Sequence, residues 1–341
     1  DLDTAKHSIR YHNLFYWNLD LDSAVLVADT SFSFLRKTWL INEHDSVYFS
    51  QNGKRLFFGI QPEPLLPDTT LLEEEIVGVE VWNYKDARLH TQQNIELEED
   101  RKKGFRCWLD PSNRKILQLT DKVVPYIQLA DEGNAEYALG EANEHYQKYI
   151  SWEGFPLRND LYLIDLQTGG RQLFKENLRS MAYDISPKGN FIYWIDVLDS
   201  SWYAYSISER KSTNLTKQIN VRFTNELNDA PAPPHPYGIA GWTEDDAFIL
   251  IYDRYDIWKI DPTGDKNPVN LTNGRKDRNV YRYIKLDKRD RFIKTKDPLL
   301  FHTYNEITRD EGYASINIKK PNSLQPLLEE SYKFSWPTKA L

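Results

Sequence analysis

The sequence predicts an all-β chain of the β-propeller class, built from four-stranded antiparallel blades, and three observations lead to this prediction. Aromatic residues make up 13% of the 341 residues, with 10 Trp and 21 Tyr, and flat rings pack well on a pleated sheet. Short alternating segments separated by turn residues recur along the chain, as expected for β-hairpins. Two kinds of hairpin follow one another, which gives the four-stranded meander of a propeller blade.

The first recurring unit is a strand, a tight turn and a second strand that usually ends near Leu-Thr. The clearest copy runs from Asp256 to Thr272. An Asp ends the first strand of three copies, at Asp110, Asp165 and Asp261. Alternation on both sides of a Gly, Pro, Asn or Asp turn predicts a β-hairpin. Strong copies begin at residues 107, 161, 202 and 256, and weaker copies begin at residues 15 and 314.

A second strand–turn–strand unit precedes most copies of the first. Residues 48–58 and 183–193 are its best copies, residues 127–134 and 240–248 fit more loosely, and residues 283–290 are degenerate. An inner and an outer hairpin in succession make one blade. The six outer hairpins therefore predict about six blades, counting fragments at both ends.

We expect a single propeller domain over residues 1–341. A loop insertion is expected near residues 62–75, and a helical excursion near residues 86–103, where the sequence becomes polar and rich in Gln, Glu and Lys. Residues 332–337 resemble the innermost strand of a further blade. Either the two ends share a blade and seal the ring, or the propeller is truncated from seven or eight blades and exposes an edge strand.

Composition narrows the choice of partners and sites. The net charge of −8 makes nucleic acid and an anionic membrane surface poor candidates, and no apolar run reaches the roughly 20 residues of a membrane helix. Cys107 is the only cysteine, so an internal disulfide is excluded and we expect a small buried hydrophobe there. Met181 is the only methionine and the chain begins at Asp1, which we interpret as a piece of a longer protein.

Three segments carry a likeness to a known family. They are residues 236–258, residues 79–86 together with Gln92 and Gln93, and residues 185–205. These segments resemble the propeller of prolyl oligopeptidase family serine peptidases, and most of all the large dipeptidyl-aminopeptidase-like proteins of Bacteroides and its relatives. The likeness extends over most of the chain.

The resemblance implies that the propeller restricts which substrates reach an active site on another domain. In that family a propeller of seven or eight blades caps a C-terminal α/β-hydrolase domain that carries a Ser-Asp-His triad, and it admits only short peptides. The implied partners are that hydrolase domain and a peptide substrate, and the implied location is periplasmic or extracellular. A TolB-like or WD-repeat-like protein-binding propeller is the alternative. A metal-dependent propeller lyase, which needs three or more converging ligands, is the third hypothesis.

Catalytic and cofactor motifs are missing from the sequence. A nucleophile elbow needs Gly-x-Ser-x-Gly, and no two of the 15 glycines lie four apart. No two glycines lie two apart, as a dinucleotide fingerprint requires, and no Gly-Lys-Ser/Thr phosphate loop occurs. We therefore expect no catalytic, cofactor-binding or metal-binding residue in this chain, no cofactor, and no catalytic activity of the chain by itself.

Several polar residues have both a functional and a structural interpretation, and we favour the structural one for each. The carboxylate run Glu73–Glu75 could grip a peptide amino terminus, but a solvated loop is favoured. Asp20 and Asp22 resemble a fragment of a calcium loop without its Gly and distal Glu. Asn214 and Asn270 match a glycosylation pattern that the blade repeat itself explains. The seven histidines lack zinc-type pairing, and they are His7, His12, His44, His90, His145, His235 and His302.

Overall fold

The computed structural model describes residues 9–32, 34–66, 70–320 and 323–337. Within these ranges the chain is almost entirely β, and its strands form six antiparallel sheets. Four sheets have four strands, one has five and one has two. Inter-residue contacts divide the chain into two compact units, and the prediction of a single domain stays a prediction. Unit 1 comprises residues 1–153 and 157–177, and unit 2 comprises residues 154–156 and 178–341.

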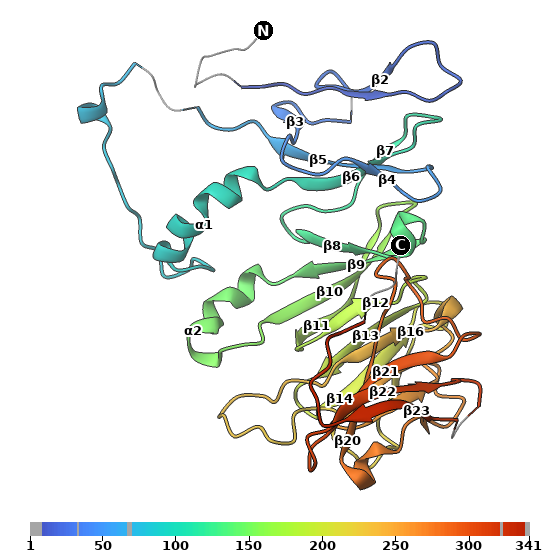
Figure 1. The fold of residues 1–341 in the computed structure, drawn as a ribbon. Coiled ribbons are helices and arrows are strands. Elements are labelled where there is room, and N and C mark those ends of the chain that lie inside the picture. The colour runs from blue at the N-terminus through green and yellow to red at the C-terminus, as the bar shows by residue number, and fades with distance from the viewer. Residues whose placement is uncertain (1–8, 33, 67–69, 321–322, 338–341) are drawn as a thin grey trace. The chain divides into compact units, whose positions relative to one another are not determined.

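Unit 1 contains the first three sheets except for the last two residues of the third (Figure 1). The two-stranded sheet consists of β1 (Leu14–Tyr16) and β2 (Val25–Ala28). The five-stranded sheet consists of β3 (Trp39–Ile41), β4 (Tyr48–Phe49), β5 (Leu56–Pro62), β6 (Phe105–Leu109) and β7 (Ile116–Gln118). The next sheet consists of β8 (Tyr126–Leu129), β9 (Tyr137–Ala142), β10 (Arg158–Asp165) and β11 (Arg171–Arg179).

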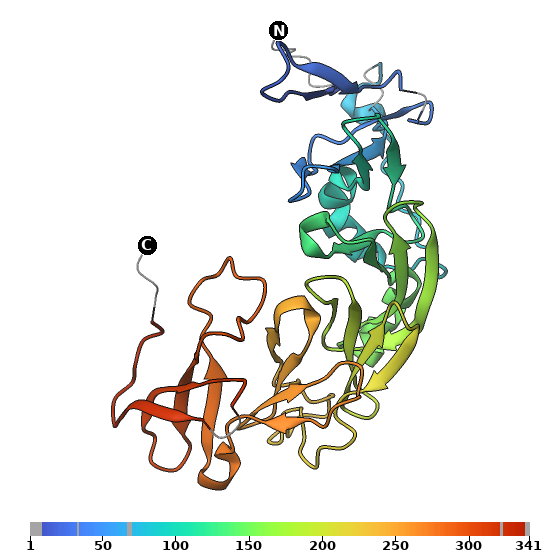
Figure 2. The same ribbon diagram turned by 90° about the vertical axis from the view of Figure 1, so that its right-hand side faces the viewer.

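Unit 2 contains three four-stranded sheets, each with its strands in chain order. Figure 2 shows the last of them, coloured orange to red, with its strands side by side. The first consists of β12 (Tyr183–Ile185), β13 (Phe191–Asp196), β14 (Ser201–Ser206) and β15 (Lys211–Asn214). The second consists of β16 (Ile239–Trp242), β17 (Ile249–Tyr252), β18 (Ile257–Ile260) and β19 (Val269–Asn270). The third consists of β20 (Asn279–Tyr283), β21 (Leu299–Asn305), β22 (Glu311–Ile316) and β23 (Gln325–Glu330).

Helices are short and lie in the connections. The described residues form two α-helices, α1 (His90–Lys102) and α2 (Ile150–Glu153). The 3₁₀ turns are η1 (Glu73–Glu75), η2 (Asp131–Gly133), η3 (Glu144–Tyr149), η4 (Glu244–Asp246) and η5 (Gly274–Asp277). The helix predicted near residues 86–103 is confirmed as α1, which buries no residue.

The predicted all-β fold of four-stranded antiparallel blades is confirmed, with about six blades counting the incomplete ones. Each outer hairpin predicted from the repeat is present, for example β18 paired with β19. Inner hairpins are present as well, for example β12 paired with β13. The degenerate copy at residues 283–290 is not a hairpin of its own, because β20 ends at Tyr283 and pairs with β21 across a long loop. Register places large rings opposite one another, as where Trp194 lies across from Tyr203 with ring centroids 5.4 Å apart.

A recurring Leu-Thr pair ends these outer hairpins. The Leu and the Thr each form a hydrogen bond with the backbone of the same residue on the preceding strand. Leu215 donates its N–H to the carbonyl of Trp202 at 2.7 Å, and Thr216 Oγ1 accepts the N–H of Trp202 at 3.1 Å. The same pair of bonds joins Leu271 and Thr272 to Ile257. All four of these Leu and Thr residues are buried, so the contact satisfies backbone groups that water cannot reach.

The recurring Asp forms the turn of the hairpin. Asp261 Oδ1 accepts the N–H of Thr263 at 3.0 Å and its hydroxyl at 2.8 Å. Asp110 accepts the same two bonds from Ser112. A carboxylate that bonds the backbone two residues ahead mimics a turn and reverses the chain.

Apolar side chains fill the space between neighbouring sheets within each unit. In unit 1, Phe57 and Trp108 of one sheet pack with Ala138 and Ile164 of the next. In unit 2, Trp202 and Trp242 belong to the cluster between the first two sheets. Phe57, Trp108, Trp202 and Trp242 thus pack between sheets, as expected for rings on alternating strand positions. Cys107 is fully buried, which confirms its prediction as a small hydrophobe.

A buried hydrogen-bonded contact also joins two sheets of unit 2. Asp246 of η4, between β16 and β17, is 1% exposed. Its Oδ2 accepts the hydroxyl of Ser186, after β12, at 2.6 Å. Its Oδ1 accepts the N–H of Lys188 at 3.1 Å. Burial raises the pKa of Asp246, while these donors act in the opposite direction.

Two expectations about the connections need comment. The predicted insertion near residues 62–75 is a loop that contains η1, and its residues 67–69 lie outside the described ranges. The prediction of an innermost strand at residues 332–337 is wrong, because this segment contains no strand. It lies against β21 and β22 instead: Trp336 stacks on His302 at 5.5 Å, and Tyr313 donates its hydroxyl to the carbonyl of Ser335 at 2.6 Å.

The buried carboxylate of Asp256 gives a stability prediction. Asp256 accepts the Thr272 hydroxyl at 2.7 Å and Asn270 Nδ2 at 3.1 Å, so its loss leaves buried donors without acceptors. We expect Asp256→Ala to lower the free energy of unfolding by about 3 kcal/mol. Urea denaturation followed by tryptophan fluorescence measures this. The matched control Asp265→Ala removes an exposed carboxylate of the same sheet's turn and is expected to change the value by less than about 0.5 kcal/mol.

Burial of Cys107 gives a second prediction. Desolvation raises the pKa of its thiol, and the thiolate is the reactive form. We expect Ellman's reagent to leave the folded protein unmodified at pH 8 and to titrate one thiol in guanidinium chloride. Rapid modification of the folded protein would contradict the placement of Cys107 between the sheets.

Candidate functional site

The structure disperses the histidines that the sequence analysis considered. His12 and His44 lie near Glu43, with nitrogen–oxygen distances of 3.6 and 3.9 Å. His145 lies 3.4 Å from Asp160, and His302 lies 3.2 Å from Glu311. His90 stacks on Trp82 and His235 on Phe155, whereas His7 lies outside the described residues. Across the described ranges, no group of three or more His, Cys, Asp or Glu residues is arranged to hold a metal ion.

The other polar candidates have structural surroundings. Glu75 of η1 accepts the N–H of Leu72, the residue before that turn, at 2.9 Å. Asp20 and Asp22 are exposed in the turn between β1 and β2. Asn214 Oδ1 accepts the N–H of Thr216 at 3.1 Å, and Asn270 makes the equivalent bond to Thr272 at 3.0 Å. Both Asn residues therefore end an outer hairpin, as the repeat predicts.

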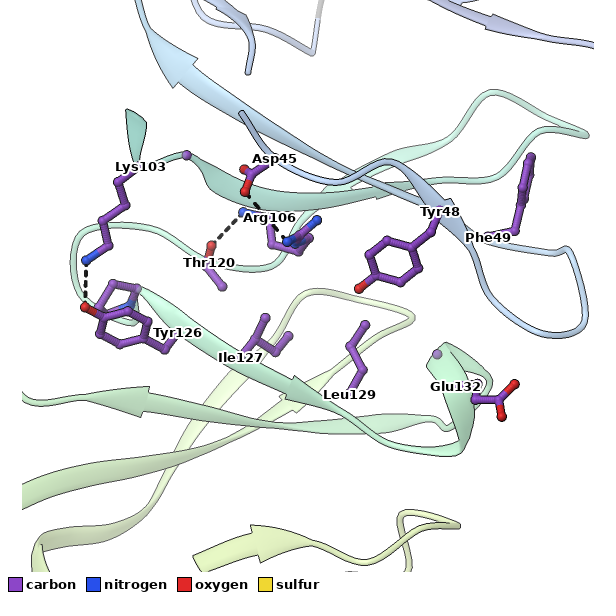
Figure 3. Close-up of a pocket in the computed structure, with 13 residues that line it drawn as sticks. Asp45, Tyr48, Phe49, Lys103, Arg106, Thr120, Tyr126, Ile127, Leu129 and Glu132 are labelled. Atoms are coloured by element: carbon purple, nitrogen blue, oxygen red, sulfur yellow. Dashed lines mark hydrogen bonds and ion pairs between the residues drawn. The ribbon is translucent and has the colours of Figure 1, made fainter. Parts of the chain in front are cut away.

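A cavity of about 740 Å³ in unit 1 is the candidate functional site (Figure 3). Its upper wall in the figure comes from the five-stranded sheet, and its lower wall comes from β8 and η2. Residues that line it are Asp45, Tyr48, Phe49, Lys103, Gly104, Arg106, Thr120, Pro125, Tyr126, Ile127, Leu129, Glu132 and Gly133. The volume lies within the range of small-ligand sites.

Arg106 is the central cation of this cavity. It lies on β6, and its backbone N–H donates to Thr120 Oγ1 at 2.7 Å. This is the same bond that Thr216 and Thr272 form in the other outer hairpins. Its guanidinium lies 3.7 Å from Asp45 and donates to the carbonyl of Ser46 at 3.0 Å. It also lies over the ring of Tyr48, 5.6 Å from the centroid. The Asp45 contact is longer than a direct hydrogen bond, so guanidinium donors remain for a ligand.

Lys103 supplies a second cation at one end of the cavity. It donates to the hydroxyl of Tyr126 at 2.8 Å, and its ammonium lies 4.3 Å from the centroid of that ring. Figure 3 shows Lys103 and Tyr126 on one side of Arg106, and Tyr48 and Phe49 on the other. The two cations therefore lie along one wall rather than at a single point.

Apolar and aromatic groups form the rest of the lining. Ile127 and Leu129 project from β8 toward the five-stranded sheet. Both residues are partly buried and pack against the cluster between the sheets. Tyr48 stacks on buried Phe57 with centroids 5.3 Å apart, and Phe49 is 44% exposed. The lining thus offers contact surface for an apolar side chain beside two positive groups.

Two glycines fix the position of Asp45. A Cβ at Gly59 would overlap the carboxylate of Asp45, and a Cβ at Gly104 would overlap Asp45 and Asn42. Asn42 in turn donates to the carbonyl of Lys102 at 2.8 Å. The Asp45 carboxylate therefore fits only because positions 59 and 104 have no side chain. From there it lies beside the guanidinium of Arg106 at the edge of the cavity.

The lining has few groups that could act as nucleophiles. The thirteen lining residues include no serine, cysteine or histidine, and the Thr120 hydroxyl already accepts a backbone N–H. Nucleophilic catalysis needs a nucleophile held beside a general base, and the lining provides no such pair. The sequence analysis did not identify these residues. Alternation in residues 126–129 was a signal, but nothing in the sequence pairs Ile127 and Leu129 with Arg106.

Comparison with known proteins gives structural likenesses only. No family model matches the chain, and no curated protein matches it. Porphyromonas gingivalis dipeptidyl peptidase 4 is similar at 12% identity and a TM-score of 0.48, over 94% of this chain and 43% of that one. A putative TolB from Agrobacterium tumefaciens is similar at 12% identity and 0.36, over 90% and 84%. A puromycin hydrolase is similar at 9% identity and 0.41, over 89% and 39%.

These likenesses do not assign the chain to a family. This chain spans less than half of the dipeptidyl peptidase and of the puromycin hydrolase. Among the described residues, no helix is long and apolar enough to cross a membrane.

The glycine contacts give a prediction about how the cavity is built. We expect Gly59→Ala to displace Asp45 and to lower the free energy of unfolding by about 2 kcal/mol, as overpacking of a close-packed contact does. Chemical denaturation measures the loss. The control Gly78→Ala adds the same methyl group where no atom lies within 4 Å, and the stability is expected to stay within about 0.5 kcal/mol. Equal stability of both variants would contradict the packing of Asp45 on Gly59.

Proposed function

We propose that this chain is a non-catalytic propeller that admits and selects short peptides for a serine exopeptidase whose α/β-hydrolase domain lies outside these residues. The chain contributes recognition and exclusion, and the nucleophile, base and oxyanion hole belong to the other domain. The alternative is a propeller that binds another protein and has no peptidase role.

The observation that carries the proposal is the lining of the cavity in unit 1. A short peptide presents apolar side chains, carbonyl groups and a terminal carboxylate. Ile127, Leu129 and Phe49 offer apolar contacts, and Arg106 and Lys103 offer donors to carbonyl and carboxylate oxygens. Pockets that fix ligand orientation with a few polar groups on an apolar surface are typical binding sites.

Residues 76–84 support a docking role toward another domain. This segment between η1 and α1 contains no strand or helix, and Val77, Trp82 and Tyr84 are 80%, 66% and 90% exposed. A run of exposed apolar side chains is typical of a surface that contacts protein. The segment overlaps residues 79–86, which resemble the peptidase family, so the hydrolase domain is the partner we propose. The same exposure favours the protein-binding alternative.

Peptide binding to the purified chain tests the proposal. We expect tetrapeptides with leucine or phenylalanine side chains to bind in isothermal titration calorimetry, and their carboxyl-terminal amides to bind more weakly. Arg106→Gln is expected to weaken binding of the free-acid peptides about tenfold, a loss of about 1.4 kcal/mol. The control Arg101→Gln removes a guanidinium from the exposed surface of α1 and is expected to leave the affinity unchanged.

Three outcomes would overturn parts of the proposal. Absence of saturable peptide binding would reject the peptide role and favour the protein-binding alternative. Equal affinities of the wild type and the Arg106 variant would place binding elsewhere. The peptidase role fails if the gene, read beyond the codon for Leu341, encodes no Gly-x-Ser-x-Gly segment followed by Asp and His.

A further inference from the structure

A second cavity, in unit 2, has a lining of different chemistry. Its volume is about 480 Å³, and connections at one end of two adjacent sheets line it. The turn η4 contributes Glu244 and Asp245, and β18 contributes Lys259. The full lining is Thr243, Glu244, Asp245, Ala247, Phe248, Lys259, Thr295, Lys296, Ile318 and Lys319. Nothing in the proposed peptide role uses this cavity.

Two lysines share one aromatic ring at the edge of this cavity. The ammonium of Lys259 lies 4.9 Å from the ring centroid of Phe248, and that of Lys266 lies 5.2 Å from the same centroid. Within the described residues, no carboxylate lies within ion-pair distance of either lysine. Lys259 donates only to the carbonyl of Ile318, at 3.3 Å. Burial, and next the charge of Lys266, lower the pKa of Lys259.

The carboxylates of η4, two of which line the cavity, have other positions or partners. Glu244 Oε2 accepts the N–H of Thr295 at 3.0 Å. Asp246 is buried against Ser186 in the neighbouring sheet. Asp245 is exposed at the rim of the cavity. The charge of Lys266 acts unfavourably on the ammonium of Lys259, and an anion bound beside both lysines would offset that repulsion.

The remaining lining matches a ligand with an apolar body. Phe248 is partly buried and lines the cavity. Ile318 is 1% exposed, so it supports the wall from inside the core. Lys296 and Lys319 are exposed at the mouth and add positive charge that attracts an anion from solution. A volume of this size holds a small molecule rather than a polypeptide segment with its side chains.

We propose that this cavity binds a small organic anion, with its carboxylate or phosphate beside Lys259 and Lys266 and its apolar or aromatic body against Phe248. A carboxylate and a phosphate are both suitable, because a lysine ammonium acts as a point charge and attracts either anion. This site is separate from the peptide cavity of unit 1, and it does not depend on a peptidase role.

Titration of the purified chain with four probes tests the site. The probes are benzoate, phenyl phosphate, inorganic phosphate and the uncharged benzamide, measured by calorimetry and by ligand-observed saturation-transfer NMR at low ionic strength. We expect saturable binding of benzoate, phenyl phosphate or both. Benzamide and inorganic phosphate are expected to bind at least tenfold more weakly, because each lacks one of the two recognised features. The stronger of the two aromatic anions identifies the preferred group.

Lysine variants locate the binding. Lys259→Met keeps an apolar stem of similar length and is expected to weaken binding at least tenfold. Lys266→Met, at an exposed position, is expected to weaken it about threefold. The control Lys211→Met removes an exposed ammonium from β15 and is expected to have no effect. The proposal is overturned if neither aromatic anion binds, if benzamide binds as tightly as benzoate, or if Lys266→Met binds like the wild type.

Discussion

Buried acceptor oxygens that receive backbone N–H groups hold this fold together. The Leu-Thr pairs that follow β15 and β19 are buried, so backbone groups beside them need partners within the protein. Thr216 and Thr272 solve this problem with a side-chain oxygen, and the leucine before each threonine fills the space between sheets. The repeat in the sequence is therefore a repeat of hydrogen-bond chemistry and of packing at once.

The features that the sequence predicted are those whose causes are local. Asp110, Asp165 and Asp261 bond to backbone two or three residues ahead, so the turn can be identified within a few residues. Helix α1 was also predictable, because a polar segment that buries nothing is set by its own composition. The segment at residues 332–337 has the alternation of a strand, yet Trp336 and Phe334 find partners on an existing sheet. The alternation of apolar and polar residues predicts an extended backbone, but it does not predict which strand or side chains that segment will contact.

Both cavities depend on contacts between residues far apart in the chain, and for that reason the sequence did not reveal them. Arg106 and Asp45 are 61 positions apart, and Lys259 and Ile318 are 59 apart. Neither set has a spacing that a motif search would detect. Asp45 needs the missing side chains of Gly59 and Gly104, and a glycine in a strand can equally mark a bulge or a bend. The absence of catalytic motifs, by contrast, is visible in the sequence, because the residues of each motif lie within a few positions of one another.

The bond between Asp246 and Ser186 has a consequence for how such chains can diverge. The turn after β12 is completed by an acceptor from the following sheet, so no blade in this pair is a self-sufficient module. Duplication or exchange of a blade would transfer a serine without its carboxylate, or the reverse. We therefore expect recombination to keep the two blades that share the Ser186–Asp246 bond together. Loops at the ends of the sheets do not take part in this bond and can change without breaking it.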